Sequence, residues 1–197
     1  MMHATPESPR MFESDLIDSF SRVPWYVVPS IYVPMIVGLF AWGVVGLQVH
    51  VGAAVLLFGA GFVVWTLTEY WLHRTLFHWT PATSWGPRFH FILHGVHHDW
   101  VNDRYRLVMP PAASLGLGVV FFAIYYALLG SLSFPFFAGK VAGYLCYDMT
   151  HYYVHHGRPT SRRMKQLKAH HMNHHHNKEE RKFGVSSTLW DQVFRTM

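Results

Sequence analysis

Apolar residues gather in four long runs along this chain. The runs cover residues 25–49, 51–72, 112–132 and 134–153. Each is long enough to cross the hydrocarbon core of a bilayer, which takes about 20 helical residues. Helices that are apolar on all sides must be buried in protein or lipid, and four of them would leave a soluble chain of 197 residues too little polar surface. The pattern predicts an all-α integral membrane protein with four transmembrane helices.

The polar segments between the runs indicate how the chain crosses the membrane. An N-terminal arm, 1–24, precedes a membrane domain, 25–197, whose segments 73–111 and 154–197 form a cap. The arm and the cap hold all but one of the 16 Lys and Arg residues. Four crossings place these basic segments on one side, which the positive-inside rule makes cytoplasmic. Lys140 is the exception, and we expect it to snorkel toward the outer interface.

Local signals predict further elements. Helices are expected over 88–100 and 161–177, and an amphipathic segment over 187–194, where Thr188 and Asp191 have the spacing of a capping box. Pro29 and Pro34 should delay or kink the first long helix. The single cysteine, Cys146, excludes an internal disulfide bond.

The chain has 16 histidines, and 14 of them lie at or beyond the predicted cytoplasmic helix ends. The segments that hold them read EYWLHRTLFH, HFILHGVHH, DMTHYYVHH and LKAHHMNHHH. His3 and His50 are isolated, and we assign them no functional role.

Helical spacing selects ten of these histidines as metal ligands. Residues at i, i+3 and i+4 share a helix face, whereas His73 and His78 converge only if their helix ends between them. Neutral imidazole suits iron, copper, zinc and nickel, and ten imidazoles fit two ions with about five ligands each. The predicted ligands are His73, His78, His94, His97, His98, His151, His155, His171, His174 and His175. His156, His170 and His176 point away from these faces.

Some neighbouring residues are candidates to hold the ligating rings in place. Histidine ligands usually donate their second N–H to a carboxylate or a carbonyl. We expect this support from Glu69 and Asp148, for which an ion pair with an arginine is the alternative, and from His90. The chain has no HExxH motif and no cysteine cluster, so a zinc hydrolase is disfavoured.

These motifs resemble those of the fatty acid hydroxylase and sterol desaturase superfamily, and more narrowly those of fatty acid 2-hydroxylases. The closer resemblance rests on SPRMFESD, VPWYVVPSIYVP, DRYRLVMPP, GYLCYDMTHYYVHH and FGVSSTLWDQVF. It implies hydroxylation at C2 of a long acyl chain, free or amide-linked in ceramide, by a non-haem di-iron monooxygenase of sphingolipid metabolism. The same ten histidines match the metal ligands of the family.

The resemblance also implies cofactors and partners. We expect two iron ions, which zinc could replace in isolated protein, with O2 as cosubstrate. Many relatives carry an N-terminal cytochrome b5 domain, which 24 residues cannot hold, so a separate cytochrome b5 or another donor should supply electrons. The membrane would be the endoplasmic reticulum in a eukaryote and the inner membrane in a bacterium. No nucleic-acid partner is expected.

The substrate is expected to enter an apolar cleft from the bilayer, with its head near the cytoplasmic surface. Arg104, Tyr105, Arg106 and Tyr147 are candidates to contact that head. The alternatives are a sterol, carotenoid or alkylglycerol oxidase of the same superfamily, or a metal-binding membrane protein without activity.

Overall fold

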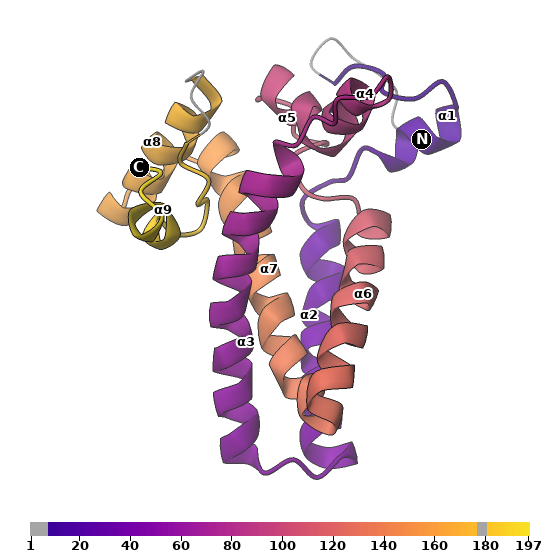
Figure 1. The fold of residues 1–197 in the computed structure, drawn as a ribbon, viewed down its shortest axis with the longest axis vertical. Helices are drawn as coiled ribbons and strands as arrows, with labels where there is room; N and C mark the ends of the chain where they lie inside the picture. The colour runs from indigo at the N-terminus through magenta and orange to yellow at the C-terminus, as the bar shows by residue number, and fades with distance from the viewer. Residues whose placement is uncertain (1–7, 177–180) are drawn as a thin grey trace.

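The computed structural model describes residues 8–176 and 181–197, and its regular elements there are helices. Long helices form a bundle, and shorter helices form a cap at one end of it (Figure 1). The all-helical prediction is confirmed. His3 lies outside the described residues.

The long helices follow the apolar runs closely. They are α2 (Val27–Ala41) with its π-helical extension η1 (Trp42–Gly46), α3 (Val51–Trp71) with the π-helix η2 (Leu72–Phe77), α6 (Pro111–Leu129) and α7 (Ser133–His156). The two proline positions fall inside α2, and neither ends the helix. His50 caps α3, where its Nδ1 accepts a hydrogen bond from the N–H of Gly52.

Three stretches have the length and apolar composition of a membrane span: Val27–Gly46, Val51–Phe77 and Pro111–His156. The third stretch contains both α6 and α7, and between them the chain reverses through the short 3-10 helix η4 (Gly130–Leu132). Gly130 takes a φ of 56° at this reversal, a conformation that favours glycine.

Glycines bring α3 and α7 into direct backbone contact. A Cβ added to Gly61 would lie 1.9 Å from the carbonyl oxygen of Phe136, and one added to Gly139 would lie 1.9 Å from that of Phe58. Small residues at such crossings let membrane helices approach closely. The two helices run parallel, and both reach the cap at their C-terminal ends (Figure 1).

The helix α6 is packed far less tightly than its neighbours, and none of its residues is buried. Large apolar side chains on it are exposed, among them Val119 at 69% and Leu128 at 73%. Near its start, the hydroxyl of Ser114 lies 2.6 Å from the Tyr32 hydroxyl of α2. This helix therefore forms an outer wall of the bundle.

Lys140 points into the bundle and not toward the interface, so the expected snorkelling is wrong. Its side chain is 2% exposed, and its Nζ donates to Thr68 Oγ1 at 2.7 Å. The ammonium group also lies 4.6 Å from the ring centre of Phe121 and 5.3 Å from that of Trp65. The hydroxyl and the aromatic faces therefore stabilise the ammonium charge inside the bundle.

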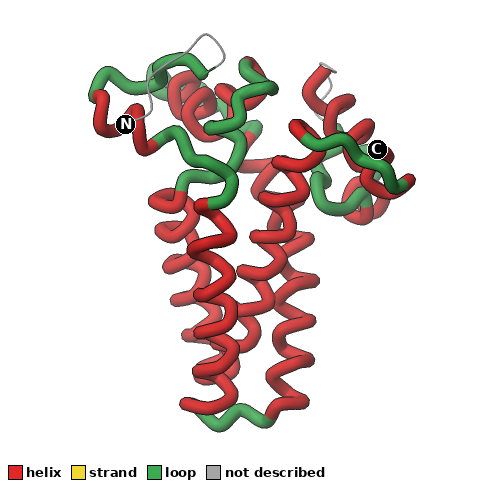
Figure 2. Tube along the Cα trace, turned by 180° about the vertical axis from the view of Figure 1, so that it is seen from behind, coloured by secondary structure: helices red, strands yellow, loops and turns green. Residues whose placement is uncertain are grey.

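The cap consists of α4 (Gly86–His90), the π-helix η3 (Phe91–Gly95), α5 (Val96–Asp99), α8 (Arg162–His176) and α9 (Leu189–Val193), and α1 (Asp15–Phe20) of the N-terminal arm lies beside it. These lie at one end of the bundle, and a short loop joins α2 to α3 at the other end (Figure 2). The helices predicted over 88–100 and 161–177 correspond to α4–α5 and α8; residue 177 lies outside the described part. The capping box is wrong, because Thr188 caps no N–H of α9 and Asp191 bonds elsewhere.

A buried ion cluster fastens the N-terminal arm to the cap. Oδ1 of Asp18 accepts hydrogen bonds from the N–H of Met11 at 2.7 Å and from Arg106 at 3.1 Å, and Oδ2 accepts from Arg22 at 2.5 Å. Burial raises the pKa of Asp18, but the main-chain donors and Arg22 outweigh it, so that the pKa lies below its usual value. Arg106 therefore lies within the protein.

Candidate metal centre

Ten histidines come together at the cap end of the bundle, in two groups of five. Within each group, one ring nitrogen of every histidine lies within 4.8 Å of those of the other four. The first histidine group comprises His73, His78, His94, His98 and His174, and the second comprises His97, His151, His155, His171 and His175. These are the ten histidines that the sequence spacing selects.

His73 and His78 meet because the winding of their helix changes. The helix ends between them, at Phe77, as the convergence of the two rings requires, and its last turn is the π-helix η2. In a π-helix the backbone bonds join residues i and i+5, which therefore lie above one another. The two ring centres are 5.1 Å apart.

Neighbouring histidines of one helix are divided between the two groups. In α8, His171 and His175 are one turn apart and belong to the second group, whereas His174, three positions after His171, belongs to the first. The histidines of η3 and α5 divide in the same way. The rings of His98 and His175, one from each group, have centres only 4.3 Å apart. Both α5 and α8 therefore serve two adjacent sites.

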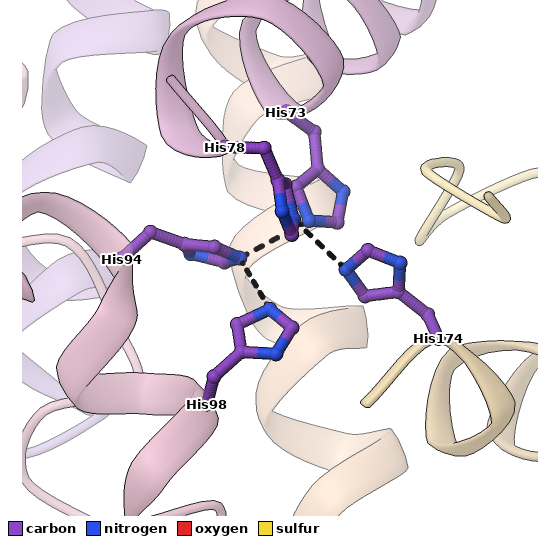
Figure 3. A group of neighbouring side chains, drawn as sticks. All are labelled: His73, His78, His94, His98 and His174. Atoms are coloured by element: carbon purple, nitrogen blue, oxygen red, sulfur yellow. Dashed lines mark hydrogen bonds between the residues drawn. The ribbon is translucent and has the colours of Figure 1, made fainter. Parts of the chain in front are cut away.

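The nitrogens at the centre of each group cannot all be hydrogen-bonded to one another. Nδ1 of His73 donates to the carbonyl of Phe183 at 2.5 Å, and Nδ1 of His174 donates to that of Arg181 at 2.6 Å. A neutral imidazole has one N–H, so each Nε2 carries a lone pair directed into the first group (Figure 3).

The ring nitrogens of the second histidine group are crowded in the same way. Nε2 of His171 lies 2.8–3.0 Å from the Nε2 atoms of His151, His155 and His175, more contacts than one N–H can serve. Lone pairs that face one another at such distances repel unless a cation lies between them. The donor sets therefore fit one transition-metal ion in each group.

Burial keeps these imidazoles neutral. Loss of solvation, together with the neighbouring rings, lowers the pKa of His78 and of His98 to about 3. The same causes lower the pKa of His94, His97 and His171. Neutral imidazole is the form that binds metals, so the groups are ready to bind at neutral pH without losing protons.

Glu69 lies against the C-terminal segment and not against a histidine ring. Its carboxylate accepts from the N–H groups of Val185 and Ser186, both at 2.9 Å, and from the Ser186 hydroxyl at 2.5 Å. Asp148 accepts from the hydroxyl of Tyr144 at 3.1 Å, one turn earlier in α7. Direct support of a ligating ring by either acid remains a prediction.

The other histidines in the described part of the chain lie outside both groups. The ring of His90 packs against Gly95, with its centre 6.3 Å from that of His78. His170 pairs with Asp191 at 3.0 Å, and His176 donates to the carbonyl of Met172 at 2.7 Å. The ring of His156 packs at a tilt against that of Tyr152, with the centres 4.8 Å apart.

A cavity of about 240 Å³ lies between α2, α3, α6 and α7. Its lining is almost entirely apolar and includes Leu39 and Phe122 deep in the bundle. At the cap end it is lined by Leu72, Phe77 and Tyr147. The cavity therefore ends beside two residues that pack against the histidine groups: the ring centre of Phe77 lies 5.4 Å from that of His94, and the ring centre of Tyr147 lies 5.7 Å from that of His151.

The four residues expected near a lipid head lie in different surroundings. Tyr147 is buried in the cavity wall, with its ring centre 5.7 Å from that of His151. Arg104 and Tyr105 are exposed, and Arg106 belongs to the Asp18 cluster. Only Tyr147 therefore lies beside both the cavity and a predicted ligand.

Comparison with known proteins agrees with this geometry. The fatty acid hydroxylase family matches residues 57–196. The chain belongs to the fatty acid hydroxylase family. The predicted membership is thus confirmed, and the hydroxylase fold extends over the matched region from α3 to the C-terminal segment.

Relatives of this hydroxylase match it over nearly its whole length. It is 38% identical to a dihydroceramide fatty acyl 2-hydroxylase of Arabidopsis thaliana, over 98% of this chain and 82% of the relative. It is 40% identical to the fatty acid 2-hydroxylase of Homo sapiens, over 95% of this chain and 56% of the relative. The solved structure of full-length scs7p, in which only the hydroxylase domain is visible, is 37% identical with a TM-score of 0.88, covering 96% of this chain and 71% of that chain.

Proposed function

We propose that this hydroxylase is a four-pass membrane enzyme that hydroxylates C2 of long acyl chains, with the ten grouped histidines holding two iron ions. The observation that carries the proposal is the apolar cavity, whose wall residues Phe77 and Tyr147 pack against one histidine of each group. The relatives named for 2-hydroxylation of fatty acids and dihydroceramides support C2 as the position and an acyl chain as the substrate.

The histidine groups supply ligands that suit iron and also accept zinc. When bound, two iron ions would supply the reduction of O2 and the oxidation of the C–H bond, chemistry that protein side chains lack. The residues of the chain bind the metals, place the substrate and exclude water.

The cavity places the substrate by shape. Leu72 and Phe77 line its cap end and belong to the helix that carries His73. Tyr147 lines it on the opposite helix, one turn before His151. An acyl chain that fills the bundle interior would thus bring its head, and the carbon beside it, to the histidines, and such positioning lowers the barrier substantially.

The orientation follows from charge. The basic arm and cap belong on the cytoplasmic side, with four crossings formed by α2, α3, α6 and α7. Electrons would then come from a separate cytoplasmic carrier such as cytochrome b5. In a eukaryotic cell this arrangement corresponds to the endoplasmic reticulum membrane.

Product analysis tests the proposal. The purified protein, loaded with iron, is supplied with cytochrome b5, its reductase and either palmitic acid or dihydroceramide, and the products are separated by mass spectrometry. We expect 2-hydroxy acyl products. Hydroxylation at another carbon, or activity only on sterols, carotenoids or alkylglycerols, would contradict the proposal.

Adjacent histidines of α8 provide a matched pair of variants. His175→Ala removes a ligand of the second histidine group and should abolish the product, whereas His176→Ala removes only a bond to a carbonyl. Equal activity of the two variants at equal protein abundance would indicate a membrane protein whose histidines do not act in catalysis.

A further inference from the structure

The segment after α8, residues 181–196, contributes no histidine, yet it touches the first histidine group through its main chain. We call it the C-terminal strap. The carbonyl of Arg181 accepts from Nδ1 of His174, and the carbonyl of Phe183 accepts from Nδ1 of His73. Such bonds fix both the tautomer and the orientation of a ligating ring.

Two buried carboxylates fix the strap, Glu69 from outside it and Asp191 from within it. Glu69 of α3, 4% exposed, accepts three hydrogen bonds from Val185 and Ser186. Asp191, fully buried, accepts from the N–H groups of Phe183 at 2.9 Å and Gly184 at 2.8 Å. The carboxylates thus bond to four successive residues, 183–186, the first of which is Phe183, whose carbonyl accepts from His73.

The second histidine group has no comparable support from the strap. His155 donates instead to the carbonyl of Val101, in the loop after α5, at 3.0 Å. The buried Nδ1 atoms of His151, His171 and His175 have no hydrogen-bond partner among the described residues. The strap therefore serves one metal site of the two.

We propose that Glu69 and Asp191 are positioning residues for one ion: through the strap they hold His73 and His174 in the geometry that the first histidine group needs. The inference rests on the metal sites of the proposed function, and it adds that the two sites differ in how they are maintained. Loosening the strap should release the ion of the first group and leave the other bound.

Glu69→Met is the decisive variant, because it keeps the volume of the side chain and removes every acceptor. The metal content of the purified protein, measured by mass spectrometry against protein concentration, should fall from two ions per chain to one. Glu69→Gln is the matched control. Its carbonyl can still accept from both N–H groups, and the Ser186 hydroxyl can turn to accept from its NH2, so two ions should remain.

Double variants show which ion is lost. Adding His78→Ala, in the first group, to Glu69→Met should leave one ion, whereas adding His175→Ala, in the second group, should leave none. Two ions in Glu69→Met, or a loss that the His78 background deepens, would overturn the proposal.

Asp191→Asn tests the same idea should Glu69→Met fail to accumulate. Whichever way its amide turns, an NH2 faces one of the N–H groups of Phe183 and Gly184, so one ion should again be lost; retention of both would overturn the proposal. The metal count is independent of the substrate. A chain that binds two ions but yields no 2-hydroxy product would contradict the proposed function and leave this inference standing.

Discussion

The backbone contact between α3 and α7 can be tested by adding one methyl group. In Gly139→Ala, the new Cβ would lie 1.9 Å from the carbonyl oxygen of Phe58 and 2.8 Å from its Cα. Both atoms belong to a helix backbone, which no side-chain rotation can move aside. The helices must separate by roughly 1 Å or more to restore ordinary contact.

The energetic effect follows from this separation. Overpacking a tight contact costs about 1–3 kcal/mol, and the upper end applies because both partners are main chain. Alanine regains up to about 1 kcal/mol of helix propensity relative to glycine. The net destabilisation is therefore about 2 kcal/mol. Gly59 also lies in α3, but nothing lies within 4 Å of a Cβ added there. Gly59→Ala should therefore be neutral or slightly stabilising.

Unfolding of both variants in the same detergent, followed by circular dichroism, measures this difference. Product formation should also fall in Gly139→Ala, because α3 and α7 carry ligands of different groups and a displacement of about 1 Å at a reacting centre costs about a hundredfold in rate. If Gly139→Ala were as stable as Gly59→Ala, α3 and α7 would not be in direct backbone contact.

Two further predictions concern buried charges. Asp18→Asn should destabilise the protein by about 3 kcal/mol near pH 7, because it leaves Arg22 and Arg106 without their carboxylate. The folded-state pKa of Asp18 is depressed, so the stability that this carboxylate adds is present above its unfolded pKa and is lost as the pH falls through the folded value. Unfolding curves of the parent protein and of Asp18→Asn should therefore converge below about pH 4. A difference in stability that does not depend on pH would contradict this. Lys140→Met should leave stability unchanged or raise it, since an apolar side chain of similar size replaces a buried charge. Thr68→Val, which removes the acceptor of Lys140 at 2.7 Å and the hydroxyl's own bond to the carbonyl of Val64, should cost about 1–3 kcal/mol in the same detergent assay, and the reverse order would refute the proposed role of the hydroxyl.

The histidine groups show how far spacing along a helix can predict a site. The i, i+3 and i, i+4 rule selects eight of the ten histidines, because on any regular helix those residues share a face, whereas His73 and His78 are five positions apart. It does not predict that His174 and His171 belong to different groups, since their division depends on where the neighbouring helices end. A sequence also gives no clear sign of the π-helix that brings His73 to His78.

Other features could not be predicted from the sequence, for a different reason. The partners of His73 and His174 are main-chain carbonyls, which every residue possesses, so no residue type marks them. The spacing of Thr188 and Asp191 predicts a capping box. The carboxylate of Asp191 instead accepts from two N–H groups at the start of the strap and is buried there. Lys140 is similar: its distance along α7 suggested an interface, and only the packing of α3 and α6 around it provides Thr68 and the aromatic rings.

The architecture explains why two ions would be coupled and yet separately adjustable. Because α3 and α7 are parallel and in backbone contact, they deliver ligands to the same level, one helix to each group. The cap helices α5 and α8 then contribute to both groups, so any movement of either must displace ligands of both ions together. The distance between the two ions would thus be set by α5 and α8, whereas the orientation of individual rings is set by separate main-chain segments, the strap for one group and the loop that contains Val101 for the other. A change in the strap can therefore alter one ion without changing the spacing of the pair.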